Sequence, residues 1–153
     1  MEQVKEALQS YIRVEILLKK FFDISGMSQY CQTCQISARE GDNKCCNSKK
    51  YGFNKIDSPV EPVFREAQKI LITPSNIEKE CKTMSKKGCQ LTYFREPICL
   101  AHLCSPEINI LKRKYGIVYC PIQIVSSLMG ILNLKEDSSK LEKKIEAWIN
   151  ILN

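Results

Sequence analysis

The chain has 153 residues, of which 44% are hydrophobic and 26% are charged. These proportions are ordinary for a globular domain and exclude a disordered chain, and the length suits a single domain over residues 1–153. The formal net charge of +6 would fit a nucleic-acid partner. Thiolate ligands on a metal would offset part of that charge, however, and the aromatic residues do not interleave with the basic ones in a recognisable nucleic-acid motif. The composition therefore argues against nucleic acid as the partner.

The first residues carry acids where a secretory signal would carry basic residues, and no apolar core of the signal type follows. The longest mostly apolar stretch, residues 122–134, is broken by polar residues and is too short to span a bilayer. We therefore expect a cytoplasmic protein that does not enter a membrane.

Residues 4–22 contain no Gly or Pro and predict an amphipathic helix that ends at Ser25 and Gly26. Its expected buried stripe consists of Val4, Ala7, Leu8, Tyr11, Val14, Leu18, Phe21 and Phe22. Residues 27–59 are polar and irregular and have too few apolar side chains to order themselves. Loops longer than about 15 residues are uncommon in compact domains unless something ties them down. We expect that tie to be a metal.

A further helix is predicted over residues 62–71, and a short one over residues 75–84, opened by Ser75 with Glu78 as a capping box. The C-terminal helices span residues 106–152. The first begins at Pro106 and ends at Gly116, and the last begins at Ser139, paired with Glu142. The middle helix begins at Pro121, with an expected inner face of Ile122, Val125, Leu128, Met129 and Leu132. The last helix is expected to bury Leu141, Ile145, Trp148 and Leu152. Apart from a short candidate strand over residues 116–120, no strand pattern is visible. The predicted fold class is mostly α, a small irregular helical domain with a cysteine-rich metal-binding region over residues 27–104.

Nine cysteines in a reducing compartment are not expected to form stable disulfides, and the odd number would leave one unpaired. Thiolates are ligands for zinc and for iron–sulfur clusters, which makes metal ligation the leading interpretation. The candidate metal ligands are Cys31, Cys34, Cys45, Cys46, Cys89, Cys99 and Cys104. They would form one site or two. Cys120 is interpreted as structural, and Cys81 is left undecided.

The spacing within each cluster bears on its chemistry. Cys31-Gln-Thr-Cys34 lets two thiolates reach one ion at about 2.3 Å. The same spacing also occurs in redox pairs, but the strand-turn-helix context of such pairs is missing. Adjacent residues such as Cys45 and Cys46 seldom bind one tetrahedral ion together, so either one of them ligates and the other packs, or they serve two metals.

The segment Cys99-Leu-Ala-His-Leu-Cys104 contains the single histidine of the chain. Cys104 directly precedes a predicted helix start, where free N–H groups and the helix dipole favour an anion. His102 has three readings: a metal ligand, a hydrogen-bond donor to a ligand sulfur, or a partly buried polar residue bonded to backbone. Arg95 would either offset the negative charge of a thiolate site and hold backbone carbonyls, or lie on the surface.

Together these motifs resemble the CxxCxxCC family of small proteins, the YkgJ-type zinc- or iron-chelating domains. The resemblance covers residues 31–104 and rests on the Cys31-x-x-Cys34 pair, the Cys45-Cys46 pair, Cys89 with Leu91, and Arg95 followed by Cys99-x4-Cys104. Ten residues separate Cys34 from Cys45 where the family has two, and the proline stands at position 97. The resemblance implies chelation of zinc or an iron–sulfur cluster, with no reaction attached.

The chain carries no Gly-rich phosphate loop, no His-Glu-x-x-His motif and no nucleophile elbow. The expected function is therefore binding of zinc or an iron–sulfur cluster through cysteine, with a protein as the partner that a cluster would require. Two alternatives stay open at this point. One is an iron–sulfur component of a redox or electron-transfer enzyme, and the other is a zinc-stabilised module that binds nucleic acid or protein. Whether the chain is an enzyme is left open.

Overall fold

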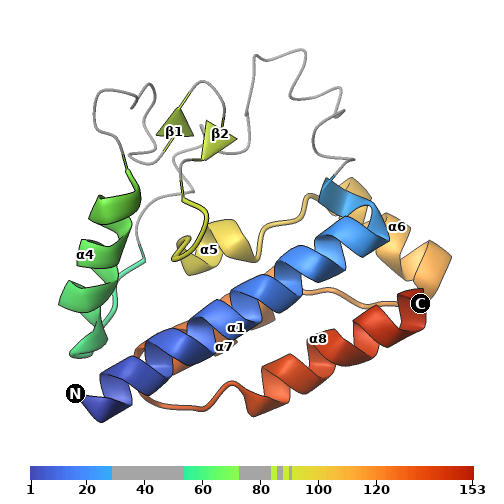
Figure 1. The fold of residues 1–153 in the computed structure, drawn as a ribbon. Coiled ribbons are helices and arrows are strands. Elements are labelled where there is room, and N and C mark those ends of the chain that lie inside the picture. The colour runs from blue at the N-terminus through green and yellow to red at the C-terminus, as the bar shows by residue number, and fades with distance from the viewer. Residues whose placement is uncertain (29–53, 73–83, 86–87, 90) are drawn as a thin grey trace.

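The computed structural model of the protein describes residues 1–28, 54–72, 84–85, 88–89 and 91–153. Its helices are α1 (Glu2–Ser25), α4 (Val60–Leu71), α5 (Pro97–Leu100), α6 (Ser105–Tyr115), α7 (Pro121–Leu132) and α8 (Ser139–Leu152) (Figure 1). Two antiparallel strands, β1 (Met84–Ser85) and β2 (Gly88–Cys89), have two residues each. The predicted mostly α fold is confirmed. Within the described ranges, no helix combines the length and the apolar character that crossing a bilayer requires.

The central element is α1, along which α7 and α8 pack (Figure 1). Its apolar residues recur at helical spacing, so one face is buried. That face consists of Val4, Ala7, Tyr11, Val14, Leu18 and Phe21, with Leu8 and Phe22 partly buried beside them. Gly26 ends the helix at φ 83°, a left-handed conformation that glycine adopts without a Cβ clash. The helix predicted over residues 4–22 and its end at Gly26 are confirmed.

Helix α8 runs in the same direction as α1. Arg13 of α1 pairs with Glu142 near the start of α8, and further along the rings of Phe21 and Trp148 lie 5.2 Å apart. Tyr119, which precedes α7, completes an aromatic cluster with centroids 6.2 Å from Phe21 and 5.6 Å from Trp148. Each such ring contributes about 1.5–3 kcal/mol through burial, and the pair geometry adds to this.

The expected inner face of α7 is partly wrong. Ile122 is 81% exposed, whereas Ile124, Leu128, Ile131 and Leu132 are buried. Val125 and Met129 are only partly buried against the core. Gln123, Ser126, Ser127 and Gly130 form a polar stripe on α7. The apolar arc beside that stripe is wide, so helical periodicity alone does not determine which part of the arc is buried. Packing against α1 selects it.

The helix ends follow the expected capping chemistry with two corrections. Helix α6 begins at Ser105 rather than Pro106, and its N-cap is Cys104. Helix α6 ends at Gly116, which has φ 67°, as predicted. The N-cap of α8 is Ser138 rather than Ser139, and the Ser138 hydroxyl donates to the Glu142 carboxylate. A serine pair leaves the N-cap ambiguous by one residue, and the turn before α8 decides it. Helix α8 buries Leu141, Ile145, Trp148 and Ile149, and Leu152 is partly buried.

Helix α4, the two short strands and the loop of residues 116–120 complete the fold. Helix α4 covers the predicted residues 62–71 and begins two residues earlier, at Val60. The helix predicted over residues 75–84 lies outside the described residues except at its end, where Met84 belongs to β1 and the prediction is wrong. The strand considered for residues 116–120 is absent, since these residues form a loop that buries Ile117 and Tyr119.

Candidate functional site

The segment of residues 91–104 leads from the β1–β2 pair to α6 and carries Cys99, His102 and Cys104. Helix α1 fixes its first turn. Glu15 accepts the N–H of Phe94 at 2.8 Å through Oε1 and the N–H of Arg95 at 3.2 Å through Oε2, and the Tyr11 hydroxyl donates to the Arg95 carbonyl. Phe94 has φ 60°, which is a left-handed conformation. Such a conformation costs about 1–3 kcal/mol in a residue other than glycine and persists only where surrounding contacts enforce it.

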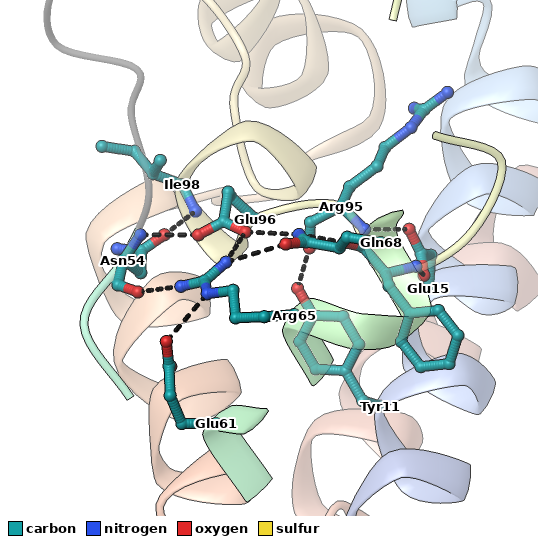
Figure 2. A network of polar contacts seen from close by, with 10 residues as sticks. Tyr11, Glu15, Asn54, Glu61, Arg65, Gln68, Arg95, Glu96 and Ile98 are labelled. Carbon is teal, nitrogen blue, oxygen red and sulfur yellow. Dashed lines mark hydrogen bonds and ion pairs between the residues drawn. The ribbon is translucent and has the colours of Figure 1, made fainter. Parts of the chain in front are cut away.

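A network of polar side chains joins this segment to α4 (Figure 2). Glu96 is 4% exposed. Its Oε1 accepts the Asn54 N–H at 2.6 Å, and its Oε2 accepts Arg65 Nη1 and Gln68 Nε2, each at 2.5 Å. A buried carboxylate is tolerated only when it is paired and hydrogen-bonded, and here both oxygens are.

Arg65 lies at the centre of the network. Its Nε donates to Glu61 at 2.9 Å, its Nη1 also donates to Gln68 Oε1 at 2.9 Å, and its Nη2 donates to the Asn54 carbonyl. Burial lowers the pKa of Arg65, but the hydrogen bonds to Glu96 and Glu61 outweigh burial and raise the pKa above its ordinary value. The guanidinium therefore stays charged beside Glu96.

Asn54 is held through three of its polar groups. The N–H donates to Glu96, the carbonyl accepts from Arg65, and the side-chain oxygen accepts the N–H of Ile98 at 3.1 Å (Figure 2). Asn54 directly follows residues 29–53, which lie outside the described part of the chain. Asn54 is thus fixed beside Ile98, the residue that precedes Cys99 in the chain.

The carboxyl group of Glu15 has a strongly shifted pKa. Burial raises the pKa of Glu15 from 4.5 to about 7. The N–H groups of Arg95 and Phe94 and the positive charges of Arg95 and Lys19 lower the pKa, but less than burial raises it. Glu15 is therefore a half-titrated group near neutral pH.

A cavity of about 320 Å³ lies between the end of α1 and the 91–104 segment. It is lined by Glu15, Lys19, Phe22, Asp23, Met27, Ser28, Thr92, Arg95, Cys99, Leu100, His102 and Leu103. Two of the residues singled out from the sequence, Cys99 and His102, thus line one cavity. Arg95 lines it too, and its Nε donates to the Leu91 carbonyl at 3.0 Å. Holding a backbone carbonyl is one of the two roles that the sequence predicted for Arg95.

His102 is half-buried beside this cavity. Burial lowers its pKa, and the nearby Glu107 carboxylate raises it to a smaller extent. The imidazole is therefore neutral at physiological pH. Neutral imidazole is the form that binds metal ions.

The start of α6 differs from the prediction. Glu107 is 1% exposed, and its Oε1 accepts both the N–H and the Sγ–H of Cys104, each at 3.2 Å. A carboxylate of the chain itself thus occupies the place where an anion site was expected. An anionic cluster bound at Cys104 would lie next to the Glu107 carboxylate.

Of the other predicted ligands, Cys31, Cys34, Cys45 and Cys46 lie outside the described residues, as does Cys81. Cys89 belongs to β2. Cys120, expected to be structural, is the half-buried N-cap of α7. In the ranges that the structure describes, no three His, Cys, Asp or Glu side chains are grouped to hold a metal ion.

The sequence analysis missed the acids and amides that anchor this site, namely Glu15, Asn54, Gln68 and Glu96. One signal was available for Glu15, because it lies one residue after Val14 within the apolar stripe of α1 and shares its buried face. Gln68 likewise follows Phe64 at helical spacing. Polar residues on an apolar face indicate a buried network that needs partners elsewhere in the fold.

No family model, no curated protein and no solved structure matches this chain. The resemblance to the CxxCxxCC family accordingly stays a prediction. The function has to be inferred from the chemistry of the residues and from the geometry around Cys99.

Proposed function

We propose that the chain is a metal-binding protein in which cysteine thiolates hold zinc or an iron–sulfur cluster. The residues that would hold it are those of the predicted set, Cys31, Cys34, Cys45, Cys46, Cys89, Cys99 and Cys104. Bound metal would neutralise thiolate charge and link ligand-bearing segments that lie far apart in the sequence.

The observation that carries this proposal is that both ends of the 29–53 segment adjoin the segment that carries Cys99. At one end, Met27 and Ser28 line the same cavity as Cys99 and His102. At the other end, Asn54 is bonded to Glu96 and Ile98. The described residues on either side of the segment with the first four cysteines, Ser28 and Asn54, therefore both adjoin the segment that carries Cys99.

Chain connectivity limits how far two of the thiols can lie from the cavity. Cys31 follows Ser28 by three residues, and Thr92 follows Cys89 by three. Three Cα–Cα steps of about 3.8 Å cannot exceed about 11 Å. Cys31 and Cys89 are each three residues from a residue that lines the cavity, and the neutral imidazole of His102, which also lines it, offers a nitrogen ligand.

The test is the metal content of protein purified anaerobically and under reducing conditions. We expect the variants Cys99→Ser and Cys104→Ser to lose metal, because serine is a poor ligand for zinc and for iron–sulfur clusters. Cys120→Ser is the matched control, because Cys120 is a half-buried N-cap outside the cavity lining. Equal metal content in all three variants, or none in the wild type, would refute the proposal.

The same preparation distinguishes the two kinds of metal. A cluster gives broad charge-transfer absorption in the visible range together with acid-labile sulfide, whereas zinc gives colourless protein with stoichiometric metal.

A further inference from the structure

We propose that Glu96 is a positioning residue for metal binding, which fixes the segment that carries Cys99 against Asn54 and α4. This inference rests on the proposed function, because what Glu96 positions is the segment with the predicted ligand Cys99. Glu96 has no part in ligation and acts through Asn54, Arg65 and Gln68.

Glu96 connects parts of the fold that lie far apart in the sequence. Glu96 receives hydrogen bonds from Asn54, Arg65 and Gln68, which lie 42, 31 and 28 residues away in the chain. Three residues after Glu96 comes Cys99, in the short helix α5. One carboxylate thus joins α4, Asn54 and the helix with a predicted ligand (Figure 2).

Glu96 is also chemically complementary to its partners. The backbone of Asn54 and the side chains of Arg65 and Gln68 all present donors to Glu96, and a carboxylate offers only acceptors. An amide in its place would turn one oxygen into an NH₂ group that faces other donors. Glu96→Gln therefore breaks the arrangement while changing almost nothing in size.

The energetics of the network indicate what it contributes. A buried ion pair adds little net stability compared with apolar packing, because desolvation of both charges is costly. A fully bonded polar network does fix one geometry among many that apolar packing would allow. The network of Glu96 therefore serves to define the position of the segment that carries Cys99 more than to stabilise the helices, whose cores lie along α1.

The test compares cobalt and zinc binding by wild type and Glu96→Gln, each stripped of metal under reducing conditions. Zinc affinity is measured by competition with a chromophoric chelator, and ligand geometry by the visible spectrum of the Co²⁺ form. We expect Glu96→Gln to bind zinc about 10- to 100-fold more weakly, as is typical for residues that orient ligands. We also expect an altered Co²⁺ spectrum, with the helical circular dichroism of the metal-free protein retained.

Glu142→Gln is the matched control. Glu142 is likewise a carboxylate that accepts from an arginine and a second donor, but its partners are Arg13 and Ser138, outside the lining of the cavity. The Glu142→Gln variant should bind zinc with the same affinity as the wild type and give the same Co²⁺ spectrum. If Glu96→Gln does not fold, Asn54→Ala tests the positioning role instead. It removes only the side-chain acceptor for the Ile98 N–H and should also weaken zinc binding.

The outcomes separate the two proposals. If the wild type binds metal and the folded Glu96→Gln variant, or Asn54→Ala in its place, binds it with unchanged affinity and spectrum, the positioning role is wrong and metal binding stands. An equal loss in Glu142→Gln also overturns the positioning role. If the wild type binds no metal, both proposals fail.

Discussion

The contact of α1 with α8 and the contact of α1 and α4 with the 91–104 segment are built from different chemistry. The first is apolar and aromatic, centred on Phe21, Trp148 and Tyr119. The second adds hydrogen bonds of Glu15, Glu96 and Arg65 with their backbone and amide partners to the edge-to-face contacts of Phe64 with Tyr11 and Phe94. Apolar packing is strong and insensitive to orientation, whereas hydrogen bonds between buried charges are directional. The molecule thus has a stable helical scaffold and, beside it, an oriented segment that carries the candidate ligands.

Removal of metal should separate the two regions most clearly. We expect chelation under reducing conditions to leave most of the helical circular dichroism, because α1, α7 and α8 pack without the cysteines. Protease cleavage should increase within residues 29–53 while the flanking Met27 and Ile56, which are buried, stay protected. Structural zinc contributes on the order of 10 kcal/mol in small finger peptides, which makes this the largest expected effect. Collapse of the helical signal on chelation, or a segment that stays protected, would contradict the division.

Substitutions in the aromatic cluster should lower the stability of the helical scaffold the most. Phe21 is fully buried, stacks with Tyr119 and makes a tilted ring contact with Trp148. Phe21→Ala should lower the free energy of unfolding by about 3–5 kcal/mol, measured by urea denaturation followed by circular dichroism. The neighbouring Phe22→Ala is the comparison, since Phe22 is only partly buried and should cost less. Equal losses in both variants would contradict the assigned face.

The polar contact made by Glu15 should make the free energy of unfolding depend on pH. The pKa of Glu15 is about 7 in the fold against an ordinary 4.5, so between these values the folded chain keeps a proton that the unfolded chain has released. The free energy of unfolding should therefore fall as pH rises through this window, by at most about 3 kcal/mol. The measurement is urea denaturation at several pH values for the wild type and for Glu15→Gln, which cannot titrate.

The difference between the two curves isolates Glu15, because other groups cancel. His102 is one of them, and its lowered pKa acts in the opposite direction, since the unfolded chain takes up a proton that the folded chain does not. A difference that does not change with pH would show that Glu15 is not buried against the Phe94 turn as described.

The smallest expected effect tests which face of α7 is buried. Ile122→Ser should change the free energy of unfolding by less than about 0.5 kcal/mol, because Ile122 is 81% exposed. Ile124→Ala, two residues on, should cost about 2–5 kcal/mol, because Ile124 is 1% exposed. Both are read from urea midpoints at one protein concentration, and a reversed order would restore the face expected from the sequence.

The helices with one apolar face and clear ends could be predicted, because these signals are local. Residues 4–22 show the stripe, and Gly26 and Gly116 supply the left-handed ends. Where the local signal was ambiguous, prediction failed in part. The wide apolar arc of α7 did not show which part of it is buried, and the N-cap of α8 is Ser138 although the helix begins at the predicted Ser139. The metal ligands remain a prediction, since most of them lie outside the described residues.

The helical class of this protein and the candidate cysteines follow from the sequence, because periodicity, capping residues and side-chain chemistry are properties of a few neighbouring residues. The packing of the helices is needed to see that Glu15 holds the turn at Phe94, that Glu96 joins Asn54 to α4, and that Cys99 shares a cavity with His102. The hydrogen bonds of Glu15 and Glu96 link residues 28 to 80 positions apart. A buried carboxylate is recognisable only from its partners, and which donors meet it is fixed by how the helices pack.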